Sequence, residues 1–213
     1  MTALIENEKS RFAMPLPFKG KARGHCYFAY GSNMNTAQML ARCTKPTAIA
    51  VAKLAHHRIA FFGYSKVWDG GAATVVPAPD HDVWGVIYSL SFSDRDRLDT
   101  WQDVRLDGTG AYFHYPVRVT DTQGTTHIVL LYKKDLLGEP RRPSREYLDC
   151  IVRGAEERGL PSEYIEELRR MDAPKAAYAV PKLNKFGRGM LLGTACDCGD
   201  LRAAKGGPGF KAL

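Results

Sequence analysis

The sequence lacks any apolar run that approaches the length of a membrane-spanning helix. Its start, residues 1–24, is mixed and charged and lacks the apolar centre of a secretory signal peptide. Hydrophobic residues make up 45% of the chain and charged residues 25%, which is usual for a globular protein in water. We therefore expect a cytoplasmic protein with no membrane partner, and a basic, flexible N-terminal tail over residues 1–24.

Cysteine is scarce and scattered: the chain has five, with no zinc-binding spacing apart from one Cys-x-Cys. Because five is an odd number and the spacing is irregular, we expect reduced thiols. Cys196 and Cys198 flank Asp197, but two thiols without a second pair or a nearby histidine make a weak metal site. The sequence therefore predicts no bound metal ion.

Patterns typical of nucleic-acid binding are also absent, although the formal net charge is +7. The chain shows no recognition-helix pattern and no row of alternating aromatic and arginine residues. The positive excess lies in the first 25 residues, between Arg141 and Arg145, and beyond Ala173. This distribution indicates basic tails and a solvated face, and its field can draw an anionic small molecule towards a cleft. We expect no nucleic-acid partner.

With 213 residues the chain can bury a substantial core. We predict one domain over residues 25–172, followed by a basic extension over 173–213 that is rich in proline and glycine. Short strands dominate up to about Tyr132, a pair of helices follows, and the two do not alternate regularly. This order favours an α+β fold, with a mostly antiparallel or mixed sheet curled into a partial, barrel-like form and peripheral helices.

The individual elements are predicted from periodicity and turn residues. Pro77 and Pro79 should end the pairing of their strand, Pro116 requires an edge or a bulge, and Ser93 is the expected cap of a short helix. The expected strands cover 26–30, 48–54, 58–64, 73–76, 82–90, 111–120 and 126–132. The expected helices cover 37–42, 94–102, a segment from Ser144 to Gly159 and a segment that begins near Ser162.

The candidate binding loop in this sequence is the stretch from Tyr27 to Asn33. A continuous apolar and aromatic run, Cys26–Tyr30, ends abruptly in three turn-forming residues, Gly31–Asn33. Glycine after a buried strand permits a sharp turn, and the N–H groups there can point together into a concavity that suits an anion. Asn35 or Thr36 can cap the next helix, whose N-terminus also favours negative charge. The alternative is a plain turn with no ligand.

This heptapeptide resembles the signature loop of the γ-glutamylcyclotransferase family, Tyr-x-x-Tyr-Gly-Ser-Asn, at every motif position. Residues 70–74 are similar to the family's Gly-Gly-x-Ala-Thr, residues 83–86 to its Val-Trp-Gly-Val strand, and residues 154–164 to its final helix pair. The matches run in order from Tyr27 to Met171. The resemblance implies a small mixed barrel with helices around it and the loop at the mouth of a cavity.

The resemblance also implies a reaction. The α-amine of a γ-glutamyl substrate attacks the γ-carbonyl and expels an amine, leaving 5-oxoproline, with no metal or cofactor. Such a reaction needs a carboxylate of raised pKa to move protons, and donors for the α-carboxylate and the oxyanion. We expect a small γ-glutamyl amino acid, amine or conjugate as partner, and a homodimer is one candidate assembly. The implied substrate-binding residues are Tyr27, Tyr30, Gly31, Ser32, Asn33, Met34, Tyr112 and Tyr132.

The sequence departs from the family at the catalytic glutamate, which lies between a Leu-Asp and a Gly-Val pair. The corresponding segment, Leu98–Val104, has Gln102 at that position, and an amide cannot carry a proton at neutral pH. No glutamate at all occurs between Glu8 and Glu139. The proton-transfer group must therefore be another residue, or the catalysis is lost.

Asp103, one residue further on, is the predicted substitute, and Asp99 is expected to support it. The alternative for Asp103 is an exposed loop acid. His114 and His127 lie on predicted strands and can carry protons, although a lone strand histidine is usually structural. Three interpretations stay open: a cyclotransferase, a binding protein for γ-glutamyl compounds or small anions on the same fold, and an enzyme of altered acyl or amine transfer.

Overall fold

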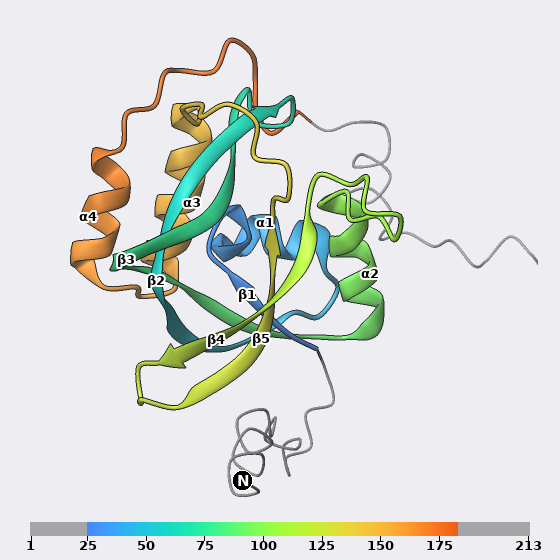
Figure 1. Ribbon diagram of the computed structural model, residues 1–213, viewed down its shortest axis with the longest axis vertical. Coiled ribbons are helices and arrows are strands. Elements are labelled where there is room, and N and C mark those ends of the chain that lie inside the picture. The colour runs from blue at the N-terminus through green and yellow to red at the C-terminus, as the bar shows by residue number, and fades with distance from the viewer. Residues whose placement is uncertain (1–24, 183–213) are drawn as a thin grey trace, which may run out of the picture.

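The computed structural model describes residues 25–182, in which five strands close into one barrel (Figure 1). The strand order is β1-β3-β2-β4-β5, and every pairing is antiparallel except that of β1 with β5, which closes the barrel at Tyr27 and Leu130. The expected α+β fold with a mixed barrel is confirmed, and the sheet closes completely. The strands are β1 (His25–Ala29), β2 (Thr47–Ser65), β3 (Gly70–Leu90), β4 (Phe113–Asp121) and β5 (Thr126–Lys133).

The helices pack around this barrel, with α3 and α4 on one side of it in Figure 1 and α2 on the other. Ser144 caps α3 by accepting a hydrogen bond from the Tyr147 N–H, and Gly159, at φ 68°, follows its end. Asn35 caps α1 in the same way, as predicted, by accepting from the Gln38 N–H at 3.2 Å. The helices are η1 (Ser32–Met34), α1 (Thr36–Arg42), α2 (Phe92–Trp101), α3 (Arg145–Glu157) and α4 (Ser162–Arg170).

The second and third strands are longer than the sequence suggested. Residues 48–54 and 58–64 are parts of a single strand, β2, and residues 73–76 and 82–90 are parts of β3. The two strands form one hairpin that extends beyond the barrel wall (Figure 1). The turn of this hairpin covers residues 66–69, between the two strands, and the breaks predicted within each strand are absent.

A β-bulge explains those false breaks. Pairing runs from His57 and Pro77 directly to Ala55 and Asp82, so the ladder skips the intervening residues and then resumes. The expectation that Pro77 and Pro79 end the pairing is therefore correct only locally, because pairing with β2 stops after Pro77 but resumes at Asp82 within the same strand. A proline lacks the N–H that a ladder needs, and the bulge removes that requirement locally.

The start of α2 is a second correction, because Ser91 rather than Ser93 is its N-cap. The Ser91 hydroxyl accepts a hydrogen bond from the Asp94 N–H at 3.1 Å. The helix accordingly begins at Phe92 and ends at Trp101, one residue before the predicted end. Gln102, which follows it, therefore stands at the C-cap.

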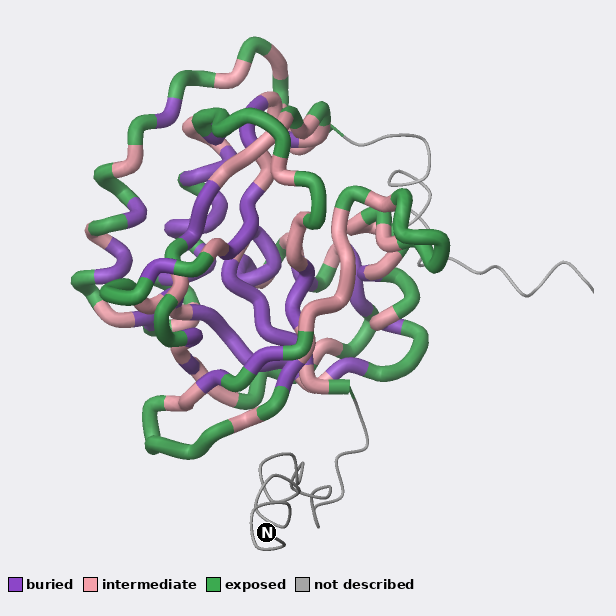
Figure 2. The backbone as a smooth tube through the Cα atoms, in the orientation of Figure 1, coloured by how far each residue is buried: buried purple, intermediate pink, exposed green. Residues whose placement is uncertain are grey.

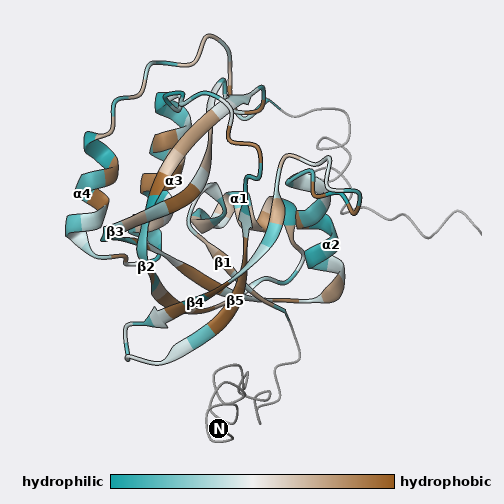
Figure 3. Ribbon diagram, in the orientation of Figure 1, coloured by the Kyte–Doolittle hydropathy of each residue, from teal (hydrophilic) through white to brown (hydrophobic). Residues whose placement is uncertain are grey.

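The core fills the barrel and the space between the barrel and α3 (Figure 2). Apolar residues predominate along parts of β3 and β5 (Figure 3). Phe28, Ile87 and Leu131 have no exposed surface. Each such side chain stabilises the fold by about 1.5–3 kcal/mol through burial. This packing fixes β1, and with it the loop that follows.

Two glycines let neighbouring elements approach the loop closely. A Cβ on Gly85 would lie 2.3 Å from the Ala29 carbonyl oxygen, so only glycine allows β3 this close to β1. A Cβ on Gly154 would lie 2.4 Å from the Asn35 nitrogen, so α3 packs directly on the backbone that follows the loop. The loop is thus held from both sides by backbone.

Residues 173–182 run from α4 back to the β2–β3 hairpin (Figure 1). The Arg145 N–H donates to the Pro174 carbonyl at 2.7 Å, and the Lys182 N–H donates to the Val67 carbonyl at 2.7 Å. The first part of the predicted extension is therefore bonded to the domain, while the rest of it, including the Cys-x-Cys, lies outside the described residues. Within residues 25–182 no helix has the length and apolarity needed to cross a membrane.

Candidate active site

A cavity of about 480 Å³ opens where β1 ends. Its wall combines the Gly31–Asn33 loop, the end of α2 and parts of β3 and β5. Six tyrosines line it, which gives a surface of aromatic faces and hydroxyl groups. They are Tyr27, Tyr30, Tyr64, Tyr112, Tyr132 and Tyr147.

The loop is a single turn of 3-10 helix, closed by a hydrogen bond from the Met34 N–H to the Gly31 carbonyl at 2.9 Å. The backbone conformation does not require glycine at position 31, since the φ of Gly31 is −121° and so not in the left-handed region. A Cβ there would meet only the Tyr147 hydroxyl at 3.8 Å and the Ala73 Cβ at 3.9 Å, which both belong to lining residues. The missing side chain therefore leaves space in the cavity.

A buried guanidinium stands behind this loop. Arg42, at the end of α1, is 1% exposed and donates to the Ser32 hydroxyl at 3.2 Å and to the Asn33 side-chain oxygen. Burial lowers the pKa of Arg42 to about 10, so the group stays charged at neutral pH. It forms no ion pair with any described carboxylate and lies 4.5 Å above the Trp101 ring. An uncompensated positive charge therefore faces the loop from inside the protein.

The predicted tyrosines are held by backbone carbonyls as well as by packing. The Tyr112 hydroxyl donates to the Ala73 carbonyl at 2.8 Å, and the Tyr30 hydroxyl donates to the Tyr132 carbonyl. Burial raises the pKa of Tyr30 and of Tyr112 well above the usual value. Both groups are therefore neutral donors at physiological pH, and their rings have fixed positions in the wall.

The end of α2 brings Gln102 and Asp103 to the cavity together. Asp103 adopts φ 52°, a left-handed conformation that aspartate tolerates better than most residues. Its side chain is 49% exposed and pairs with the Arg105 Nε at 2.9 Å. Asp103 is thus an ion-paired carboxylate at the cavity rim, and its burial is low.

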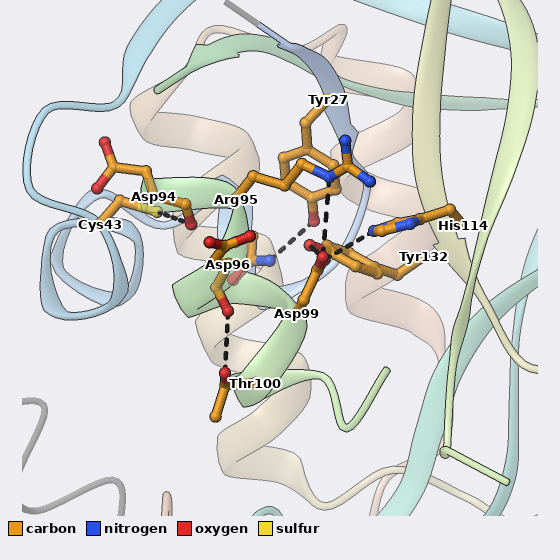
Figure 4. A network of polar contacts seen from close by, with 10 residues as sticks. Tyr27, Cys43, Asp94, Arg95, Asp96, Asp99, Thr100, His114 and Tyr132 are labelled. Atoms are coloured by element: carbon orange, nitrogen blue, oxygen red, sulfur yellow. Dashed lines mark hydrogen bonds and ion pairs between the residues drawn. The ribbon is translucent and has the colours of Figure 1, made fainter. Parts of the chain in front are cut away.

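A second carboxylate, Asp99, lies one helical turn before the rim. Its Oδ1 accepts hydrogen bonds from the Tyr132 hydroxyl at 2.6 Å and the His114 Nε2 at 2.7 Å, and its Oδ2 lies 3.7 Å from the Arg95 Nε (Figure 4). Burial and the neighbouring Asp99 raise the pKa of Tyr132 far above its usual value. His127, by contrast, bonds Asp121 at the far end of β4 and does not reach the cavity.

One further cation lines the cavity. Lys134, just beyond β5, has its Nζ 5.3 Å above the Tyr112 ring, and burial lowers its pKa. In the described part of the chain no group of histidine, cysteine or acidic side chains is arranged to hold a metal ion.

Comparison with known proteins agrees with this geometry. A family model described as AIG2-like matches residues 82–168. The chain is 33% identical to the γ-glutamylcyclotransferase of Homo sapiens over 150 residues, which is 68% of this chain and 78% of that protein. It is 32% identical to the Mus musculus protein of the same name, with the same coverage. The chain belongs to the γ-glutamylcyclotransferase family.

A solved structure named γ-glutamyl cyclotransferase superimposes with a TM-score of 0.69 at 30% identity. The match covers 79% of this chain and 98% of that one, so the shared family fold includes the barrel and the helices around it. The resemblance inferred from the Tyr-Gly-Ser-Asn loop is confirmed.

Within this γ-glutamylcyclotransferase fold, the structure gathers nearly all the predicted site residues. The exception is Met34, which is fully buried in the core and does not line the cavity. The individual roles of the predicted site residues stay predictions. The predicted residues that line the wall are Tyr27, Tyr30, Gly31, Ser32, Asn33, Gln102, Asp103, Tyr112 and Tyr132.

Sequence reasoning missed Arg42 and Lys134. A signal for Arg42 was available, since it lies seven residues, or about two helical turns, after the Asn35 cap and so on the same side of the helix as the loop. Nothing in the sequence marked Lys134, because its proximity to Tyr112 depends on the pairing of β4 with β5.

Proposed function

We propose that this protein is a γ-glutamylcyclotransferase, which converts a small γ-glutamyl compound into 5-oxoproline and an amine. The observation that carries the proposal is the cavity that joins the Tyr-Gly-Ser-Asn loop to the end of α2. Its support comes from relatives named for this activity, of which the chain covers 78%. A non-catalytic binding protein on the same fold is not favoured.

In this proposal the loop binds the anionic end of the substrate. The backbone N–H groups of Gly31 and Ser32 supply donors, and the buried charge of Arg42 makes the loop electropositive. Such charge is worth more here than in water, since the guanidinium is shielded from solvent. The six tyrosines enclose the rest of the substrate and limit its contact with water.

The reaction forms a bond between the α-nitrogen and the γ-carbon and breaks the bond from that carbon to the leaving amine. Donors near Gly31 and Ser32 stabilise the oxyanion in between. The sequence predicts that Asp103 moves the protons because it directly follows Gln102, and in the structure Asp103 also lines the cavity. Asp103→Asn tests this assignment, because an amide keeps the shape and removes the titratable group.

The experiment is an assay of 5-oxoproline release by the purified protein from a panel of γ-glutamyl amino acids and amines. We expect release with at least one member of the panel. We also expect Gln102→Glu to raise kcat, because it restores a carboxylate at the family's catalytic position. If neither the wild type nor Gln102→Glu released product or bound any panel member, the proposal would be wrong.

A further inference from the structure

We propose that protons in this cavity move through the Tyr132 hydroxyl to Asp99, which His114 holds in place, instead of through a carboxylate at position 102. The proposal rests on the cyclotransferase function proposed above and names the groups that replace its usual proton carrier. Tyr132 is the residue that contacts the substrate, Asp99 takes and returns the proton, and His114 is a positioning residue.

The geometry of Asp99 carries the first step. Three elements meet at its side chain: α2 supplies Asp99, β4 supplies His114 and β5 supplies Tyr132 (Figure 4). The hydroxyl and the imidazole both reach Oδ1, at 2.6 and 2.7 Å. A carboxylate oxygen that accepts a hydrogen bond from a hydroxyl lies in position to take that hydroxyl's proton, and carboxylates commonly serve as general bases.

The second part of the proposal depends on the position of Tyr132 in the cavity wall. Tyr132 lines the cavity, whereas Asp99 and His114 are not among its lining residues and have side chains 22% and 23% exposed. The Tyr132 ring packs on the Tyr27 ring at 5.2 Å, and the Tyr132 carbonyl accepts the Tyr30 hydroxyl. The phenol therefore belongs to the cavity wall and also donates to the carboxylate, which links the two, and its raised pKa keeps it protonated at neutral pH.

Two other candidates in the wall, Gln102 and Asp103, are less suited to the task. Gln102 has no titratable proton, and Asp103 is the only carboxylate among the lining residues that the structure describes. Asp103 is half exposed and already paired with Arg105. Asp99 is less exposed than Asp103, and its hydrogen-bond partner Tyr132 belongs to the wall.

The proton balance of the step is simple. The α-ammonium loses two protons as it becomes the lactam N–H, and the leaving nitrogen gains two as it becomes an ammonium. Each of the two protons moves in the same way. The Tyr132 oxygen takes the proton from the α-nitrogen while the Tyr132 hydroxyl proton passes to Asp99 Oδ1. The reverse transfer, from Asp99 through Tyr132, delivers a proton to the leaving nitrogen. The titratable groups in contact with His114 are Asp99 on α2 and Tyr132 on β5, and Arg95 on α2 lies 3.7 Å from the other oxygen of Asp99.

The test compares steady-state 5-oxoproline release by Tyr132→Phe, Asp99→Asn and His114→Gln, using the γ-glutamyl amino acid that the wild type turns over fastest. Since proton-transfer groups contribute about 10²–10⁴-fold, we expect the first two variants to lose at least about 100-fold in kcat with little change in KM. His114→Gln should lose about tenfold and displace the pH profile of kcat. Thermal unfolding of each variant separates these losses from misfolding.

His127→Gln is the matched control, since His127 also bonds a carboxylate at 2.7 Å from a barrel strand but lies away from the cavity. It should keep the wild-type kcat and pH profile. The relay is overturned if folded Tyr132→Phe and Asp99→Asn retain kcat within about threefold, or if Asp103→Asn loses far more than either. A His114→Gln variant that changes only the melting temperature refutes the positioning role.

Failure of the proposed function has a different signature. If the wild type binds γ-glutamyl compounds without turnover and Gln102→Glu releases 5-oxoproline, the relay is wrong while the substrate class stands. If neither protein binds or releases anything, the function is wrong, and the relay is refuted with it.

Discussion

The two walls of the cavity differ in how they are built. The loop wall, Gly31–Asn33, is backed by buried Arg42, by the core and by the backbone contact at Gly154. The α2 wall, Gln102 and Asp103, stands at a helix end, and its acid is half exposed and held by a surface ion pair. A buried wall tolerates few substitutions, whereas an exposed one can lose a catalytic carboxylate without loss of the fold. This contrast fits the sequence prediction that the chain keeps the family's loop and has Gln102 at the position of the family's glutamate.

Removal of the buried charge should damage the loop wall most. Arg42→Met leaves the Asn33 and Ser32 side chains without their buried donor, so we expect about 2–4 kcal/mol less free energy of unfolding. We also expect KM for γ-glutamyl substrates to rise at least about tenfold, because the loop loses its positive charge. Urea unfolding and steady-state kinetics measure the two effects. Arg42→Lys should raise KM less than Arg42→Met does, because it keeps the positive charge. Equal KM values for the two variants would show that the charge is not the cause.

Substitutions at Gly31, in the loop wall, and at Gly154, in the helix that supports this wall, should have different effects. Gly154→Ala places a Cβ 2.4 Å from the Asn35 nitrogen, so we expect a loss of about 1–3 kcal/mol in stability. Gly31→Ala meets nothing closer than 3.8 Å, so stability should stay near the wild type while the methyl group intrudes on the substrate and raises KM. Thermal unfolding and KM, measured for both variants, check this. Equal destabilisation by the two would contradict the contrast.

The rim ion pair should matter much less. Arg105→Gln removes the partner of Asp103, but both side chains are about half exposed, at 57% and 49%, and such pairs contribute less than about 1 kcal/mol. We expect an unchanged urea midpoint within error. A loss above about 2 kcal/mol would mean that the α2 wall is as tightly supported as the loop wall.

The smallest effect concerns pH. Glu157 on α3 accepts from the Thr36 N–H and the Asn35 amide, both at 2.8 Å, and the Thr36 N–H bond lowers the pKa of Glu157. A carboxyl whose pKa is lower in the folded than in the unfolded protein stabilises the fold above its unfolded pKa, and this is lost as pH falls through its folded pKa. Glu157→Gln should therefore lower the melting temperature slightly at pH 7 and not at pH 2.5. Glu167→Gln, an exposed glutamate on α4, is the control.

Local signals were enough for much of the fold. The aromatic run before Gly31, a cap at Asn35 or Thr36 and the helix between Ser144 and Gly159 each depend on residues close together in sequence, and each prediction agrees with the structure. The bulge that carries β3 past Pro77 could not be predicted, because it depends on pairing with β2. The same holds for the choice of Ser91 over Ser93, which differ only in how the chain enters the helix.

The sequence by itself determined the α+β class through its order of strands and helices, and its ordered motifs resembled the family that implied the mixed barrel and the loop at the cavity. It also predicts Gln102 at the position of the family's catalytic glutamate. Only the tertiary structure decided which groups stand around that position. The bonds from Asp99 to His114 and Tyr132 join residues 15 and 33 positions apart, and Arg42 reaches the loop from the far end of a helix. Such contacts are set by barrel closure and burial, which no local pattern encodes.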